Sequence, residues 1–366
     1  MSQGRVREDA LIALAQAWAR NEPVVADDKW FDSEALALFA EQIATNAPYA
    51  RFAATHGYDA ARLPLSWRDI PAAPSSAFKN AVLATFDPVA TELEFHTSGT
   101  THEHAGRHFV QRATLYDASL LASFDRFMLA DRPKLRFLNL VPNPRFKKHS
   151  SLGYMMGHVS VLRGDGKTEY FLDDDRVDAE GFARALQAAC DEAQPVLIAG
   201  TAFAFVALLE ALGARRFAAP SGSRMMETGG FKGRVKAVER GELYARLSAA
   251  FGIAPASIVA EYGMTELLSQ FYDSPESRST ELRVKVGPPW LRTLVVAAGG
   301  REVARGETGY LRHVDLANRS SALAIDTEDR GFALDDGFVL IGRDADAPPR
   351  GCSLDAEDLA ALSVAN

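Results

Sequence analysis

The feature that most restricts the fold is an alternation of short apolar runs with longer amphipathic stretches through the middle of the chain. The short runs predict strands, the longer stretches predict helices, and the two kinds interleave. This pattern is typical of parallel strands, because parallel neighbours need a crossover connection between them. We therefore expect an α/β core. The predicted strands are 135–141, 196–199 and 258–260, and the predicted helices are 114–129, 179–189, 203–212 and 235–251.

The sequence before this core has the apolar spacing of helices, and the sequence after it has short strand-like runs. Apolar residues recur at helical spacing at 11–18 and 36–43, and we expect this helical region to end at Pro48. After Pro288, short strand-like runs alternate with Gly-rich turns, which indicates a smaller β-rich lobe. The runs that predict strands in this lobe are 291–297, 310–314 and 338–341. Four parts are predicted, namely a helical region with its connecting segment, an α/β core, the β-rich lobe and a short arm: 1–90, 91–287, 288–345 and 346–366.

Composition narrows the class of protein. Charged residues make up 24% of the 366 and hydrophobic residues 47%, which is ordinary for a globular enzyme with a sizeable core. The net charge of −8 argues against a general nucleic-acid binder. With only two cysteines, a disulfide framework is excluded and a reducing compartment is the natural setting. The N-terminus is charged and no apolar run is long enough to span a membrane, so we expect a cytoplasmic protein.

The first motif is Phe95-His-Thr-Ser-Gly-Thr-Thr-His102. Its glycine lets the backbone approach an anion closely, and its hydroxyls and free amides donate hydrogen bonds to phosphate oxygens. These properties predict a loop that cradles phosphates. A polar surface loop has the same composition, so this motif alone does not distinguish a phosphate-binding loop from an ordinary surface loop. The residues assigned to phosphate binding are Thr97, Ser98, Gly99, Thr100 and Thr101.

The second motif is Glu261-Tyr-Gly-Met-Thr-Glu-Leu267, directly after the predicted strand 258–260. Its side chains should emerge at the carboxyl end of a strand, where α/β sheets bind ligands. Thr265 can donate to a phosphate, Glu266 can hold Mg²⁺, and Tyr262 offers a flat face to a base. In the alternative interpretation Tyr262 is a core residue and Glu266 a carboxylate at a helix start.

The third motif is Thr327-Glu-Asp-Arg-Gly331, followed by Asp336-Gly337 and by Arg343. The Asp329 carboxylate can accept hydrogen bonds from two ribose hydroxyls, and Asp336-Gly337 is typical of a hairpin turn. Acid-rich loops are usually solvated, so the third motif by itself is weak evidence for ribose binding.

In this order and spacing the three motifs resemble the adenylate-forming superfamily of acyl-CoA synthetases, luciferases and nonribosomal adenylation domains. The resemblance spans residues 95–343 and implies a large adenylate-forming N-terminal domain of α/β class with a β-rich lobe. It implies that the first motif handles the ATP phosphates, the second contacts adenine, the α-phosphate and Mg²⁺, and the third binds ribose. The implied nucleotide contacts beyond the first motif are Gly229, Gly230, Tyr262, Gly263, Met264, Asp329 and Arg343.

Three further segments, 149–155, 227–234 and 262–270, look like the acyl-protein synthetase family of bacterial luminescence, which is related to phenylacetate-CoA ligase. That family activates a fatty acid for a reductase complex. Ordinary superfamily members carry a further C-terminal domain that supplies a catalytic lysine. Because both this chain and that family stop shortly after Gly342-Arg343, we expect that domain to be lacking.

In that family a cysteine near the C-terminus receives the acyl group from the adenylate, and Arg350-Gly-Cys352 places one here. An adjacent cation such as Arg350 raises the thiolate fraction, and a thiolate is a strong nucleophile toward an activated carbonyl. The acyl group would then pass to an acyl reductase or another acceptor protein. For Cys190 we keep the usual interpretation of cysteine as a small core residue.

This chain departs from the superfamily at the end of the first motif. Many members continue Gly-x-Pro-Lys, whereas this one continues His102-Glu-His-Ala-Gly-Arg107 without the lysine. Either Arg107 or Lys232 would supply positive charge toward the leaving pyrophosphate, and we include Lys232 among the catalytic candidates.

Histidines offer two weaker hypotheses. The set His102, His104 and His108 suits zinc, although a loop beside phosphates explains it without a metal. His149 resembles the residue that lines the acyl pocket in many relatives, and its alternative is a surface histidine on a basic loop.

Three functions follow from these observations. The leading hypothesis is activation of a carboxylic acid, such as a fatty acid, to an acyl-adenylate, and acyl transfer to Cys352. The second is a CoA or amine ligase of the phenylacetate-CoA ligase type, in which Cys352 is structural. The third is a nucleotide-binding subunit of a reductase complex that catalyses nothing. Exchange of labelled pyrophosphate into ATP that depends on an added acid separates the enzymes from the subunit.

Overall fold

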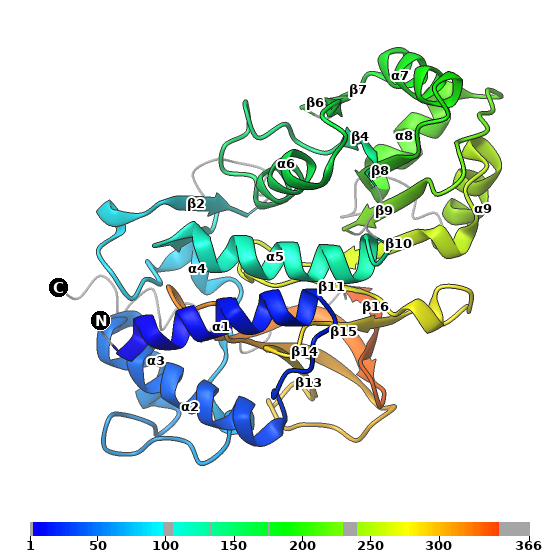
Figure 1. The fold of residues 1–366 in the computed structure, drawn as a ribbon. Helices are drawn as coiled ribbons and strands as arrows, with labels where there is room; N and C mark the ends of the chain where they lie inside the picture. The colour runs from blue at the N-terminus through cyan, green and yellow to red at the C-terminus, as the bar shows by residue number, and fades with distance from the viewer. Residues whose placement is uncertain (1–2, 98–104, 132–133, 175, 230–239, 344–366) are drawn as a thin grey trace. The chain divides into compact units, whose positions relative to one another are not determined.

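The computed structural model describes residues 3–97, 105–131, 134–174, 176–229 and 240–343 (Figure 1). They form two compact units, and each is described by itself. The first contains the described residues up to 123, together with 264–270 and those from 284 onward. The second contains those of 124–263 and 271–283. No helix within the described ranges is long and apolar enough to cross a membrane.

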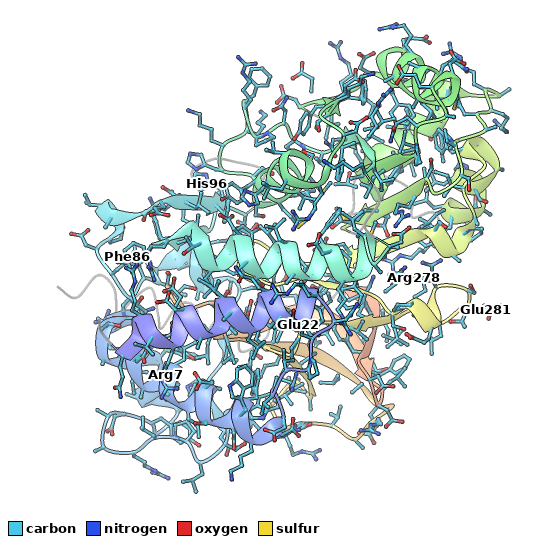
Figure 2. All side chains as sticks on the ribbon, in the orientation of Figure 1. Arg7, Glu22, Phe86, His96, Arg278 and Glu281 are labelled. Atoms are coloured by element: carbon cyan, nitrogen blue, oxygen red, sulfur yellow. The ribbon has the colours of Figure 1, made fainter. Side chains whose placement is uncertain are left out.

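Three helices open the first unit: α1 (Gln3–Ala19), α2 (Asp28–Thr45) and α3 (Ala47–Thr55). Arg7 of α1, labelled in Figure 2, pairs with Glu34 of α2 at 2.6 Å. The prediction that the helical region ends at Pro48 was wrong, because Pro48 lies in the first turn of α3. Proline is tolerated there, since the amides of a first turn have no partner inside the helix. The side chain of Asn46 caps α3 by accepting from the amide of Tyr49 at 3.2 Å.

The connecting segment leads to a hairpin whose strands flank the first motif. Strand β2 (Leu93–His96) pairs with β3 (Arg107–Val110), so that His96 lies opposite Arg107. Thr97 continues the pairing: its amide donates to the carbonyl oxygen of Gly106 at 2.8 Å, and its hydroxyl accepts from the Gly106 amide at 2.8 Å. The motif therefore starts from a fixed stem. The connecting segment contains η1 (Trp67–Asp69), β1 (Ala73–Pro74), α4 (Ala77–Asn80) and η2 (Pro88–Ala90).

The β-rich part of the first unit is an antiparallel sheet with the order β13-β14-β15-β16-β12, and β1 pairs in parallel with β15. The three strands predicted after Pro288 are confirmed as β13, β14 and β16. The turn at Asp336-Gly337 is confirmed too, since the amide of Leu334 donates to the carbonyl oxygen of Gly337 at 2.8 Å. A Cβ at Gly337 would lie 2.1 Å from the carbonyl oxygen of Lys285, so only glycine fits. The strands are β12 (Val284–Val286), β13 (Leu291–Val296), β14 (Thr308–Asp315), β15 (Ala324–Ala333) and β16 (Phe338–Arg343).

The third motif lies within a strand rather than in an acid-rich loop. Residues 327–331 belong to β15, where Asp329 is opposite Arg343 of β16 and the register shifts between Arg330 and Gly331. Acidic residues are rare in strands, so the local sequence gives no strand signal here. Pairing with the neighbouring strands overrides that local preference.

The second unit is built on a mostly parallel sheet with the order β5-β4-β8-β9-β10-β11, in which only β11 runs antiparallel to its neighbour. The three strands predicted for the core are confirmed as β4, β8 and β10. Strand β9 was not predicted, because its apolar centre is only two methionines long and lies between Arg224 and Glu227. The strands are β4 (Arg136–Leu140), β5 (Glu169–Tyr170), β8 (Val196–Thr201), β9 (Arg224–Thr228), β10 (Ile258–Tyr262) and β11 (Phe271–Asp273), with a separate pair β6 (Leu172–Asp173) and β7 (Arg176–Val177).

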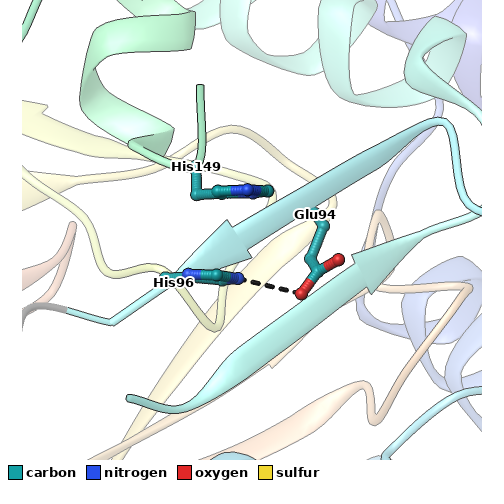
Figure 3. A group of neighbouring side chains, drawn as sticks. All are labelled: Glu94, His96 and His149. Carbon is teal, nitrogen blue, oxygen red and sulfur yellow. Dashed lines mark hydrogen bonds and ion pairs between the residues drawn. The ribbon is translucent and has the colours of Figure 1, made fainter. Parts of the chain in front are cut away.

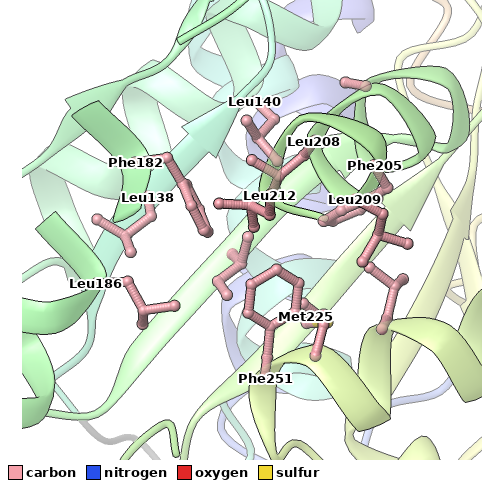
Figure 4. Close-up of a cluster of buried hydrophobic side chains, with 14 of the residues drawn as sticks. Leu138, Leu140, Phe182, Leu186, Phe205, Leu208, Leu209, Leu212, Met225 and Phe251 are labelled. Carbon is pink, nitrogen blue, oxygen red and sulfur yellow. The ribbon is translucent and has the colours of Figure 1, made fainter. Parts of the chain in front are cut away.

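Helices pack on this sheet and bury its apolar side chains. Leu138 and Met225 of the sheet meet Phe182, Phe205 and Phe251 of three different helices (Figure 4). These side chains are fully buried, which explains why the strands read as continuous apolar runs. The predicted helices are confirmed as far as they lie in the described residues: α5 (Ala113–Met128), α7 (Ala179–Asp191), α8 (Ala202–Leu212) and α9 (Arg240–Phe251), to which the structure adds α6 (Ser151–Arg163).

Candidate active site

The second motif leaves the end of β10 and forms a turn in the first unit. The amide of Leu267 donates to the carbonyl oxygen of Met264 at 3.1 Å, which closes the turn around Thr265 and Glu266. Thr265 is partly exposed and Glu266 is buried. A hydroxyl and a carboxylate on adjacent residues suit a phosphate oxygen and a hard cation.

Two side chains from outside the motif hold the carbonyl groups of this turn. His108 of β3 lies with Nδ1 2.8 Å from the carbonyl oxygen of Thr265. Asn318, after β14, donates from Nδ2 to the carbonyl oxygen of Glu266 at 2.7 Å. Its Oδ1 accepts from the amide of Leu268 at 2.9 Å. The backbone of both candidate residues is therefore held by partners far away along the chain.

Asp315, at the end of β14, supports the next part of the turn. Its Oδ2 lies 3.1 Å from the amide of Leu268, and its Oδ1 accepts from the hydroxyl of Ser269 at 2.8 Å and from the amide of Ala317 at 2.9 Å. Burial raises the pKa of this carboxyl to about 6, and these hydrogen bonds oppose the rise because they favour the ionised form. Ser269 Oγ also lies 3.0 Å from Nε1 of Trp290, which ties the turn to the residue before β13.

Gln42 of α2 holds the segment that carries Asn318. Its Nε2 donates to the carbonyl oxygen of Asn318 at 2.7 Å, and its Oε1 accepts from the amide of Leu323 at 3.0 Å. Asn318 Nδ2 also lies 3.1 Å from the carbonyl oxygen of Ala322. Gln42 of α2 therefore holds the segment 316–323, and Asn318 of that segment holds the turn. Sequence reasoning missed Gln42, Asp315 and Asn318, since isolated buried polar residues leave no periodic pattern.

His108 is fully buried, and burial lowers its pKa to about 4, against the opposing effect of its bond to the Thr265 carbonyl. The ring is therefore neutral at pH 7. Since a carbonyl oxygen only accepts, Nδ1 carries the proton, and Nε2 accepts from the hydroxyl of Ser321 at 2.8 Å. Both ring nitrogens are used within the protein, so the zinc hypothesis fails for His108. His102 and His104 lie outside the described residues.

This neutral histidine predicts a pH-dependent contribution to stability. Because its pKa is lowered on folding, the contribution is fully present above the unfolded pKa near 6.5 and is lost as pH falls toward 4. His108→Gln removes this titration. The difference in unfolding free energy between wild type and variant should therefore shrink by up to about 3 kcal/mol between pH 7 and pH 4.

Urea unfolding of both proteins at several pH values measures this difference. The comparison cancels titrations common to both proteins, including that of Asp315. A difference that stays constant across the range contradicts a neutral buried His108.

The third motif forms a second cluster in the first unit. Arg343 donates from Nε to Oδ1 of Asp329 at 3.1 Å. The amide of Asp329 donates to the hydroxyl of Thr327 at 3.1 Å, and that hydroxyl donates to the carbonyl oxygen of Leu311 at 2.8 Å. The structure therefore brings Asp329 and Arg343 together, as pairing of β15 with β16 requires.

The carboxyl ends of β9 and β10 carry polar side chains in the second unit. The hydroxyl of Thr228 hydrogen-bonds the carboxylate of Glu261, and the hydroxyl of Tyr244 donates to Glu227 at 2.9 Å. This is the sheet edge at which ligands bind in α/β folds. Gly229 follows β9 with a φ of +72°, a conformation that favours glycine.

Tyr262 ends β10, and its ring is buried with its centroid 5.9 Å from that of Phe271. This contact agrees with the core interpretation of Tyr262 and leaves a role toward a base as a hypothesis. The next residue, Gly263, is exposed.

His149 is exposed in the turn before α6. On the hairpin that flanks the first motif, His96 Nε2 donates to Oε1 of Glu94 at 2.8 Å (Figure 3). Arg107 is exposed, and its guanidinium carbon lies 5.2 Å from the ring centroid of Phe109. Several predicted site residues lie outside the described ranges, namely Ser98, Gly99, Thr100, Thr101, Gly230, Lys232 and Cys352.

The model of one protein family, described as "Acyl-protein synthetase, LuxE", matches residues 9–355 of this chain. The chain belongs to the LuxE acyl-protein synthetase family. The match covers all three motifs and the segment with Cys352. No curated protein matches the sequence significantly.

Solved structures with a similar fold include an open conformation of a 2-hydroxyisobutyryl-CoA ligase with 2-HIB-AMP and CoA. It has a TM-score of 0.63 and 15% identity, over 88% of this chain and 71% of the other. ATP-bound MatB from Rhodopseudomonas palustris has a TM-score of 0.50 and 18% identity, over 69% and 48%. An o-succinylbenzoate CoA synthetase from Bacillus subtilis has a TM-score of 0.50 and 20% identity, over 71% and 51%.

The LuxE-family chain spans about half the length of the last two of these proteins. At such low identities the likeness shows the fold alone. The α/β class predicted from the sequence is confirmed, with a mostly parallel sheet in the second unit and the β-rich part in the first.

Proposed function

We propose that this LuxE-family protein activates a carboxylic acid with ATP and then passes the acyl group to the thiol of Cys352. The observation that carries the proposal is the turn at 264–267, which presents a hydroxyl and a carboxylate on a backbone fixed by His108 and Asn318. The family match supports the same chemistry. A fatty acid is the proposed substrate, and an acyl reductase is the proposed final acceptor.

In the first step a carboxylate oxygen of the acid bonds to the α-phosphorus of ATP. The bond from that phosphorus to the oxygen bridging to the β-phosphate breaks, and pyrophosphate leaves with the electron pair. Negative charge gathers on the α-phosphate oxygens in the transition state, where a fixed donor such as the hydroxyl of Thr265 is most effective. Thr97, at the base of the first motif, would start the loop that holds the other phosphates.

Glu266 would hold Mg²⁺, which usually binds one or two carboxylates together with substrate phosphates. A single buried carboxylate on a fixed turn fits that requirement. When bound, the ion supplies positive charge to the phosphates. Lys232 or Arg107 would add charge on the side of the leaving pyrophosphate.

Asp329 would accept hydrogen bonds from the ribose hydroxyls, and Arg343 holds its carboxylate in place. We expect Asp329→Ala to raise the KM for ATP by about tenfold or more and to leave kcat nearly unchanged. Hydrogen bonds to a charged group contribute about 1.5–3 kcal/mol, and ribose contacts are nearly equal in the ground and transition states. Steady-state exchange kinetics measure both constants.

Glu328→Ala is the matched control for this prediction. Glu328 is the exposed neighbour on the same strand, and its carboxylate lies 3.8 Å from Arg343 Nη1. Its loss should leave the KM for ATP unchanged. If Asp329→Ala also leaves that KM unchanged, Asp329 is not the ribose ligand.

In the second step the thiolate of Cys352 attacks the acyl carbonyl carbon of the adenylate. A carbon–sulfur bond forms, the carbon–oxygen bond to AMP breaks, and AMP leaves with the electron pair. Only the thiolate is an effective nucleophile here, and the neighbouring Arg350 would favour it. The thioester retains enough reactivity to pass the acyl group to a partner protein.

Exchange of labelled pyrophosphate into ATP tests the first step. Wild-type protein is assayed with a panel of fatty and aryl acids, and exchange should appear only with acids that the enzyme activates. The absence of exchange with every acid would overturn the proposal and favour a non-catalytic nucleotide-binding subunit. Direct capture of the acyl group by added CoA, without labelling of the protein, would favour a CoA ligase.

A further inference from the structure

Two groups of hydrogen bonds to residues 264–269 differ in what they hold. One group involves Asp315, which binds the amide of Leu268 and the hydroxyl of Ser269. The other goes to the carbonyl oxygens of Thr265 and Glu266. The first group anchors the end of the turn to β14. The second acts on the residues that carry the chemistry.

Each carbonyl has a partner of a specific kind. The His108 ring carries its proton at Nδ1 because the carbonyl oxygen of Thr265 can only accept, and Nε2 accepts from the hydroxyl of Ser321. Asn318 donates with one atom of its amide and accepts with the other, so it bonds Glu266 and Leu268 at the same time. An aspartate has no donor for this purpose, and a leucine has neither group.

The supports themselves are buried and fixed. His108 and Asn318 are 0% exposed, and each is held by a second element. Gln42 of α2 bonds the main chain of Asn318 at 2.7 Å. Asn46, which precedes α3, bonds the carbonyl oxygen of Ser321 at 3.2 Å. Contacts from α2 and from Asn46 therefore hold the residues that in turn hold the turn.

We propose that His108 and Asn318 are positioning residues for adenylate formation, which set the Thr265 hydroxyl and the Glu266 carboxylate through the main chain of the turn. This inference rests on the proposed function. Fixed donors stabilise developing charge without reorganising during the reaction, so positioning acts mainly on kcat. A displacement of about 1 Å by a change outside the reacting groups costs about a hundredfold in rate.

Two substitutions of His108 separate its two hydrogen bonds. The amide nitrogen of asparagine can reach the place of Nδ1, so His108→Asn keeps the donor to Thr265 and loses the link to Ser321. The longer side chain of glutamine reaches the place of Nε2, so His108→Gln keeps the link to Ser321 and loses the donor. Ser321→Ala is the control, since it removes the second bond only.

The expected result is a kcat for acid-dependent exchange lowered by about 10- to 100-fold in His108→Gln and by no more than about fivefold in His108→Asn and Ser321→Ala. The KM for ATP and the calorimetric affinity for ATP should change by less than about fivefold in all three. Thermal unfolding accompanies each measurement. Equal losses of kcat in the two His108 variants, or losses that follow the melting temperature, would overturn the positioning role.

Asn318→Asp provides a second test should the His108 variants fail to fold. It keeps the acceptor for Leu268 and removes the donor to Glu266, so kcat should fall by about tenfold or more at a similar KM for ATP. An unchanged kcat in this variant would overturn the role of Asn318. If wild type shows no exchange with any acid, the proposed function fails and the positioning role fails with it. If wild type exchanges pyrophosphate and the variants keep the wild-type kcat, only the positioning role is overturned.

Discussion

Replacing Glu266 by glutamine is expected to lower the rate of adenylate formation by about a hundredfold or more, and replacing Thr265 by alanine should do the same. Removal of one group that stabilises transition-state charge typically costs about 2.7–4 kcal/mol. Both changes are small, and the backbone of the turn keeps its bonds to His108 and Asn318. The fold should therefore remain intact in both variants.

Acid-dependent exchange of labelled pyrophosphate measures this loss, and thermal unfolding checks the fold. Thr265→Ser is the matched control, because it retains a hydroxyl on the same backbone and should keep activity within about tenfold of wild type. Wild-type exchange rates in both Glu266→Gln and Thr265→Ala would remove the turn from the proposed active site.

Replacing Cys352 by serine should abolish stable acyl labelling of the protein and leave acid-dependent exchange at the wild-type rate. The two half-reactions separate because the thiol enters only after the adenylate has formed. In wild type, neutral hydroxylamine should release the label, as expected for a thioester. Labelling should also weaken as pH falls, since the thiolate fraction drops.

Cys190→Ser is the control for this experiment. Cys190 is half-buried on α7, and its thiol lies 3.4 Å from the carbonyl oxygen of Ala218. Burial raises the pKa of this thiol, assisted by the charge of Asp191, so it is a poor nucleophile at neutral pH. The control should label as wild type does. Persistence of hydroxylamine-labile label in Cys352→Ser would instead point to Cys190 or to another protein as the acceptor.

Much of the fold was predictable because its signals are local. The helices of the core and the strands β4, β8 and β10 follow from periodicity within each segment. The turn at Asp336-Gly337 was predictable for the same reason. Strand β15 was not, because acidic residues at 327–331 oppose a strand and only the pairing with β14 and β16 stabilises it.

The residues of the candidate site also divide into those that local sequence predicted and those that only the structure showed. Thr265, Glu266 and Asp329 were identified because each belongs to a short contiguous motif, in which residue type and spacing directly express the chemistry. His108 was noticed only as a member of a histidine set, for which zinc was the weaker of two explanations, and its two hydrogen bonds contradict zinc binding. Asn318 and Asp315 carried no signal at all.

The sequence by itself therefore determined the family and the fold class, and it supplied the proposed ATP contacts as predictions. The tertiary structure alone decided what holds those residues in place. His108 is 157 positions from Thr265, and Asn318 is 52 positions from Glu266. Contacts at such separations arise only when the chain has packed, because a buried hydrogen bond needs both partners brought together and shielded from water.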